Sequence, residues 1–143
     1  MDVNILYAAA PCQLQQRIQM LVVAVDAAVH YKRKVCVFGR SMVNVVNIAL
    51  EMGYLTAPEG TFIEPEEINR YRDDRLCILT TGSQGEPMAG LSRMADGSHR
   101  QVTIHAGDTV IISASPIPGN ETSVGRTIDS LMKLGAHVVT SAT

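Results

Sequence analysis

Three short segments of the sequence combine glycine with small polar side chains in a pattern that suits anion binding. They read FGRSM (residues 38–42), TTGSQGEP (residues 80–87) and SASPIPGNE (residues 113–121). Glycine lets a backbone come close to a phosphate, and small hydroxyl groups add hydrogen-bond donors without bulk. The segments therefore favour phosphate or sugar-phosphate ligands, although a glycine-rich turn can also serve only to reverse the chain.

Each of these segments follows an apolar run that is typical of a strand buried on both faces. Such runs cover residues 3–9, 34–38, 75–79, 109–113 and 137–139. Apolar residues at helical spacing separate them, within residues 14–29, 42–50, 88–94 and 124–134. Strands that alternate with helices predict an α/β fold, with a doubly wound, mainly parallel sheet flanked by helices. In such a sheet ligands bind beyond the carboxyl ends of the strands, which is where the three segments would lie.

Two segments interrupt the alternation. Residues 57–75 are rich in charge and turn formers, and they predict a loop with one short helix that begins at Pro65. Asp73 and Asp74 in this loop are interpreted as a solvated edge rather than as a pair of catalytic carboxylates.

Residues 95–108 form the second interruption. Their pattern predicts a turn at residues 96–97, a short edge strand over residues 100–104 and a second turn at residues 106–108.

The composition narrows the class of protein. The 143 residues carry 12 basic and 14 acidic side chains, so phosphate binding would have to be local rather than spread over a basic surface. The sequence shows no signal peptide and no apolar run long enough to span a membrane, and we expect a cytoplasmic protein with no membrane partner. Cys12, Cys36 and Cys77 lie far apart, and we interpret them as reduced core residues without a metal or redox role.

Familiar catalytic and cofactor motifs are absent from the sequence. The segment GSQGEP lacks the third glycine of GxGxxG, and neither GKS, GKT nor GxSxG occurs. The four histidines are isolated, with no HxH, HxxxH or HExxH spacing, and we expect no metal ion and no cofactor in this chain. The residues alone therefore indicate an α/β ligand-binding scaffold without visible chemistry.

Three stretches together resemble the β-CASP domain of bacterial ribonuclease J, in the metallo-β-lactamase superfamily. They are FGRSM, TTGSQGEPMAGLSRMADGSHRQVTIHAGDTVIISASPIPGNE and VGRTIDSLMKLGAHVV, and the similarity runs from about residue 34 to residue 139. The resemblance implies a parent RNA hydrolase with endonuclease and 5′-to-3′ exonuclease activity and two zinc ions. Because the HxHxDH metal motif is absent here, residues 1–143 are interpreted as a single β-CASP domain excised from a longer protein and inactive in isolation.

The resemblance also implies a set of residues that face RNA phosphates and sugars. They are Arg40, Ser41, Gly82, Ser83, Gln84, Gly85, Ser115, Gly119 and Asn120. The implied partners are single-stranded RNA and the metallo-β-lactamase domain of the same polypeptide, with a homo-oligomer or an RNA-degradation complex as a further expectation.

Two other interpretations stay open at this stage. The chain could be a self-contained Rossmann-like enzyme that binds a nucleotide or sugar phosphate through Ser83, Ser115 and Asn120. It could also be a protein interaction module whose acidic segment, residues 64–74, contacts a partner.

Overall fold

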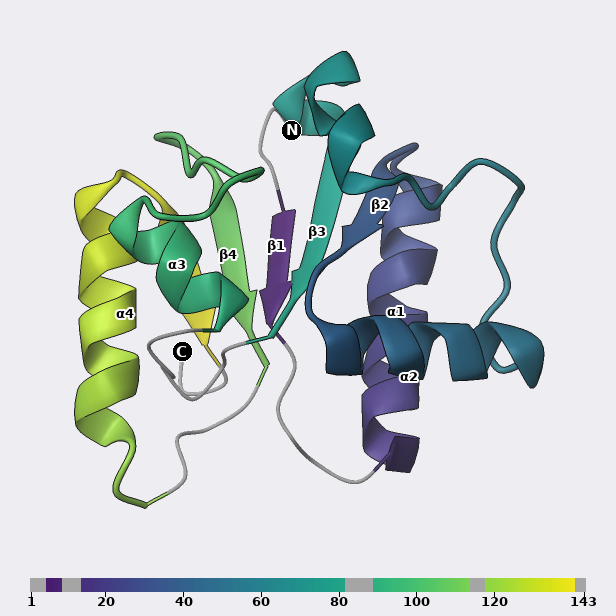
Figure 1. Cartoon of the computed structure of the whole chain (residues 1–143), viewed down its shortest axis with the longest axis horizontal. Coiled ribbons are helices and arrows are strands. Elements are labelled where there is room, and N and C mark those ends of the chain that lie inside the picture. The colour runs from purple at the N-terminus through teal and green to yellow at the C-terminus, as the bar shows by residue number, and fades with distance from the viewer. Residues whose placement is uncertain (1–4, 9–13, 82–88, 114–117, 141–143) are drawn as a thin grey trace.

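The computed structural model describes residues 5–8, 14–81, 89–113 and 118–140, and these form a parallel β-sheet covered by helices (Figure 1). The strands are β1 (Ile5–Ala8), β2 (Lys34–Val37), β3 (Leu76–Thr80), β4 (Thr109–Ile112) and β5 (His137–Thr140). Their order across the sheet is β2-β3-β1-β4-β5, and every neighbouring pair is parallel. The prediction of an α/β domain with a parallel sheet is confirmed.

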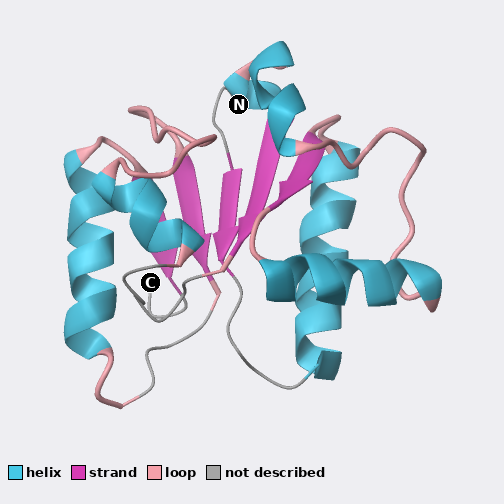
Figure 2. Cartoon of the chain, in the orientation of Figure 1, coloured by secondary structure: helices cyan, strands magenta, loops and turns pink. Residues whose placement is uncertain are grey.

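Helices cover the sheet in two pairs (Figures 1 and 2). They are α1 (Leu14–His30), α2 (Arg40–Glu51), α3 (Gly90–Asp96) and α4 (Glu121–Lys133), with short 3₁₀ helices η1 (Pro65–Arg70) and η2 (Asp73–Arg75). Figure 1 shows α1 with α2 on one side of the strands and α3 with α4 on the other. The short helix that was predicted to begin at Pro65 is confirmed.

The continuous apolar run of β3 is explained by burial of the strand on both faces of the sheet. All five of its residues are buried, because alternate side chains enter two separate hydrophobic clusters. Cys77 and Leu79 pack with α1 and α2, whereas Leu76 and Ile78 pack with α3 and α4. Both faces of the strand are therefore excluded from water, and no polar alternation remains in the sequence.

The edge strand predicted over residues 100–104 is wrong. Val102 and Ile104 are buried, at 5% and 7% exposure, but no strand of the described chain pairs with this segment. The backbone N–H groups of Gln101 and Val102 donate instead to Nδ1 of His99, over 3.2 and 3.1 Å. The alternating apolar pattern thus belongs to a loop that packs on the core, since a side chain takes the place of a ladder partner.

The charged segment of residues 57–75 is more firmly attached than a solvated loop. The N–H of Val35 in β2 donates to the carbonyl of Thr61 (2.8 Å), and the N–H of Ile63 donates to the carbonyl of Val35 (2.9 Å). Ile68 of η1 is buried in the core. Part of the segment therefore extends the sheet beyond β2 before the chain turns into η1.

The two cysteines that the structure describes lie in the core, as the sequence predicted. Cys36 and Cys77 are buried and free, while Cys12 lies outside the described residues. Burial raises the pKa of both thiols to about 12, with nearby Glu64 adding to the effect at Cys36 and Arg33 opposing it at Cys77. In the described part of the chain, no helix is long and apolar enough to cross a membrane.

Candidate functional site at the carboxyl edge of the sheet

Four of the nine predicted site residues lie among the described residues, at the starts of two helices. Arg40 and Ser41 are the first residues of α2, and both are exposed. Gly119 and Asn120 immediately precede α4. Figure 1 shows that these helices begin at the same edge of the sheet but on opposite sides of it, so the two pairs do not form one compact cluster. The remaining predicted residues lie outside the described ranges, namely Gly82, Ser83, Gln84, Gly85 and Ser115.

Glycines bring the starts of α2 and α3 against the end of β3. The N–H of Phe38 donates to the carbonyl of Leu79 over 2.8 Å. Gly39 follows with φ +99°, and a Cβ there would lie 2.8 Å from Cγ2 of Thr81. A Cβ at Gly90 would likewise collide with the hydroxyl of Thr80. These two glycines are therefore required by close packing of the chain, whatever ligand the edge binds.

The start of α2 has the features of an anion site. Its N-cap residue is Gly39, which offers no side-chain hydrogen bond to the first turn. The first N–H groups of a helix lack intrahelical partners and carry the positive end of the helix dipole. The exposed Arg40 places a full positive charge beside them. A phosphate at this position would meet backbone donors and a guanidinium together.

The start of α4 suits an anion less well. Asn120 makes no side-chain cap hydrogen bond, so the first turn of α4, like that of α2, has no side-chain cap from its N-cap residue. However, Glu121 is in the first turn, and its Oε2 accepts a hydrogen bond from the N–H of Gly119 over 2.8 Å. The carboxylate already occupies the place that an anion would take and repels a second one. Of the helix starts of α2 and α4, that of α2 is therefore better suited to a phosphate.

An aromatic pair close to the start of α2 was missed by the sequence analysis. The rings of Phe38 and His99 meet edge to face, with centroids 4.9 Å apart. Nδ1 of His99 accepts two backbone N–H groups, which assigns the proton of the neutral ring to Nε2. Burial, and then the nearby Arg93, lowers the pKa of His99 below its ordinary 6.5, so the ring is neutral at pH 7. No local spacing relates these residues, because they come from different connections of the fold.

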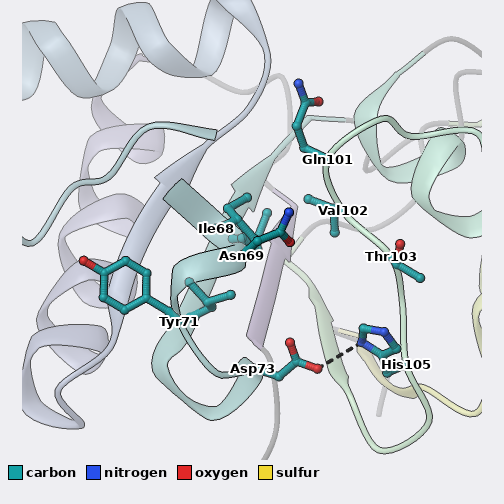
Figure 3. Close-up of a pocket in the computed structure, with 10 residues that line it drawn as sticks. Ile68, Asn69, Tyr71, Asp73, Gln101, Val102, Thr103 and His105 are labelled. Atoms are coloured by element: carbon teal, nitrogen blue, oxygen red, sulfur yellow. Dashed lines mark ion pairs between the residues drawn. The ribbon is translucent and has the colours of Figure 1, made fainter. Parts of the chain in front are cut away.

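A second polar cluster lies at the opposite edge, where β3 and β4 begin. Oδ2 of Asp73 lies 2.9 Å from Nδ1 of His105, and the N–H of His105 donates to Oδ2 of Asp108 over 2.7 Å. Asp73 and His105 also line a cavity of about 250 Å³ (Figure 3). Asp73 therefore has a specific partner rather than only solvent, which refines the interpretation of this loop.

Comparison with known proteins decides the family. Residues 6–131 match the family described as "Ribonuclease J, beta-CASP domain". The chain belongs to this family. It is 51% identical over 116 residues to ribonuclease J 1 of Streptococcus pyogenes serotype M3, covering 81% of the chain and 21% of that protein. The ribonuclease J of Corynebacterium glutamicum is 50% identical over 117 residues, covering 82% of the chain and 16% of that protein.

The β-CASP chain is short relative to these proteins. Against ribonuclease J of Mycolicibacterium smegmatis it is 48% identical over 126 residues, which are 88% of the chain and 22% of that protein. It thus spans about a fifth of the length of the curated relatives it matches. The resemblance drawn from the three glycine-containing stretches is confirmed at the level of the family.

The residues that the structure describes do not form a site for the two zinc ions implied by the resemblance. The HxHxDH motif does not occur in the sequence. His30 ends α1, His137 begins β5 and His99 uses Nδ1 to hold a loop, so these rings are dispersed. Among the described residues, only His105 joins two carboxylates within ligand range, which is too few groups for a two-metal centre.

Proposed function

We propose that this chain is the RNA-clamping β-CASP domain of a zinc-dependent ribonuclease J that acts in RNA maturation and mRNA decay. The observation that carries the proposal is the family match over residues 6–131, combined with the uncapped start of α2 beside Arg40. The activities of the whole protein, as endonuclease and 5′-to-3′ exonuclease in the cytoplasm, are part of the same proposal. So is the doubly wound, Rossmann-like classification, which the helices on both sides of the sheet support.

The residues of this chain would bind and orient RNA rather than break its bonds. Arg40 would pair with a phosphate, and Ser41 with the first N–H groups of α2 would donate to the same group. The Phe38–His99 pair offers aromatic surface close by, and bases of single-stranded RNA commonly stack on such rings. The zinc chemistry would be supplied by the metallo-β-lactamase domain of the same polypeptide.

The same proposal includes the five predicted residues that lie outside the described ranges. Gly82, Ser83, Gln84 and Gly85 would form the turn that faces the RNA, with Ser115 in a neighbouring segment. A homo-oligomer or an RNA-degradation complex of the whole protein is a further expectation. The alternative of an interaction module built on the acidic segment, residues 64–74, is not part of this proposal; Ile68 in that segment is buried in the core.

Binding of single-stranded RNA to Arg40→Ala tests the proposal. Fluorescence anisotropy with a labelled, 5′-phosphorylated RNA should show binding at least about tenfold weaker than that of the unmodified chain. The slope of log affinity against log salt should also fall by about 0.7, the value for one lost phosphate contact on a single strand. Arg70→Ala is the matched control, because Arg70 is exposed on η1 and makes only a 3.8 Å ion pair with Glu67.

Two outcomes would contradict the proposed RNA site. One is equal weakening by Arg40→Ala and Arg70→Ala, which would mean that the RNA responds only to net charge. The other is the absence of measurable binding by the unmodified chain at low salt.

A further inference from the structure

The cluster at the amino-terminal edge of the sheet has the composition of a metal site. Asp73, His105 and Asp108 each offer a ligand atom, and these three atoms all lie within 4.8 Å of one another. We propose that they bind one divalent transition-metal ion of the Mn²⁺ to Zn²⁺ series. The site would be separate from the two zinc ions of the parent enzyme and would lie at the opposite edge from the RNA site.

The geometry requires only small movements of side chains. Transition ions form bonds of about 2.0–2.2 Å to histidine nitrogen and carboxylate oxygen, which sets neighbouring ligand atoms roughly 3 Å apart. Oδ2 of Asp73 and Nδ1 of His105 are already 2.9 Å apart. The side chains of Asp73 and His105 are 46% and 56% exposed, so they are free to rotate toward an ion.

The charge balance of the cluster favours a cation. Asp108 is buried, at 4% exposure, and it accepts the N–H of His105 through Oδ2. Two carboxylates surround one imidazole, and the neighbouring Arg72 pairs with Asp74 instead (3.3 Å). A dication would balance both carboxylates at once.

The adjoining cavity is an independent observation in favour of a ligand. It has a volume of about 250 Å³ and an apolar floor that includes Leu76 and Ile78, and Asp73 and His105 line it. Figure 3 shows these two side chains directed toward each other from facing segments. A water molecule takes about 30 Å³, so the cavity has room for water ligands that would complete the coordination.

The ligand set selects the class of ion. Ca²⁺ and Mg²⁺ prefer oxygen ligands alone, whereas an imidazole with carboxylates suits Zn²⁺, Co²⁺ and Mn²⁺. The bound ion would join η2 to the loop that precedes β4, since Asp73 comes from the first and His105 from the second. The ion is therefore expected to cross-link η2 and the loop before β4, and so to stabilise the folded chain. From the sequence alone no metal is expected, because Asp73 is distant in sequence from His105 and Asp108, whereas the fold brings it to them.

Titration of the metal-free 143-residue chain with Zn²⁺ tests the proposal, using isothermal calorimetry and Co²⁺ absorption as a report on coordination. We expect one ion per chain with an affinity in the micromolar range. Asp73→Asn and His105→Gln should each weaken binding at least about tenfold. A hundredfold excess over Kd should raise the Tm by about 9 °C, because the ion binds only the folded chain.

Two variants are matched controls. His137→Gln removes an exposed histidine and Asp96→Asn an exposed carboxylate, and neither residue belongs to the cluster. Both should bind Zn²⁺ as the unmodified chain does. The proposal is overturned if no saturable binding occurs, if several ions bind with equal weakness, or if Asp73→Asn and His105→Gln leave the affinity unchanged. None of these results bears on the RNA site, because no RNA is present in the assay.

Discussion

Substitution of Gly39 by alanine separates the packing role of the carboxyl edge from any role in ligand binding. Gly39 has φ +99°, and a new Cβ would lie 2.8 Å from Cγ2 and 3.0 Å from Oγ1 of Thr81. Left-handed backbone costs an alanine about 1–2 kcal/mol. Overpacking adds about 1–3 kcal/mol. We therefore expect Gly39→Ala to lower the free energy of unfolding by about 2–5 kcal/mol in urea denaturation.

Gly119→Ala is the matched control for this experiment. Gly119 has the same φ of +99°, but a Cβ there would have nothing within 4 Å. This substitution should lower the free energy of unfolding by only the cost of left-handed backbone, about 1–2 kcal/mol. The difference between the two variants measures the contact with Thr81.

A double-mutant cycle with Thr81→Ala tests the cause directly. That change removes both atoms that crowd the new Cβ and leaves only the Cβ of residue 81, at an ordinary 3.5 Å. The double variant should recover at least about 1 kcal/mol relative to additivity. The reasoning is refuted if Gly39→Ala costs no more than Gly119→Ala, or if the two changes at the contact are additive.

Two further predictions concern groups whose pKa is shifted. Burial raises the pKa of Cys36 and Cys77 to about 12, so at pH 8 both thiols should react with a thiol reagent only as fast as the domain unfolds; rapid labelling of the native chain would contradict the fold. Burial lowers the pKa of His99 below 6.5, so unfolded chains take up its proton first, and stability should fall as pH drops from 6.5 toward the lower folded value. As the pH falls through this window, the difference in unfolding free energy between the unmodified chain and His99→Phe should shrink. A constant difference would refute the assignment of the lowered pKa to His99.

Strand β3 was predictable because its burial is complete. In a parallel sheet covered on both faces, the side chains of a central strand are mostly apolar, as in Leu76 to Leu79 of β3. The start of α2 was predictable for a related reason, since glycine directly before a helical stripe marks a tight connection. Both signals are local in the sequence, and both depend on a single element.

The wrong edge strand and the incomplete interpretation of Asp73 and His105 both arose where the structure depends on partners from elsewhere in the chain. Val102 and Ile104 alternate as in a strand, but whether they form one depends on a neighbouring edge, and His99 takes that place. Asp73 and His105 were interpreted separately as a solvated acid and an isolated histidine, although they lie 2.9 Å apart. Their meeting follows from the positions of β3 and β4 on either side of β1.

The two proposed sites lie at opposite edges of the parallel sheet and bind ligands of opposite charge. At the carboxyl edge, helix starts direct backbone donors outward, and the field there favours a polyanion. At the amino-terminal edge, Asp73 shortly precedes β3 and Asp108 directly precedes β4. The negative charge of these two carboxylates favours a cation there. An RNA phosphate and a metal ion would therefore bind at opposite ends of the strands, where neither neutralises the groups that hold the other. A change of Asp73 should leave RNA affinity intact, and a change of Arg40 should leave Zn²⁺ affinity intact.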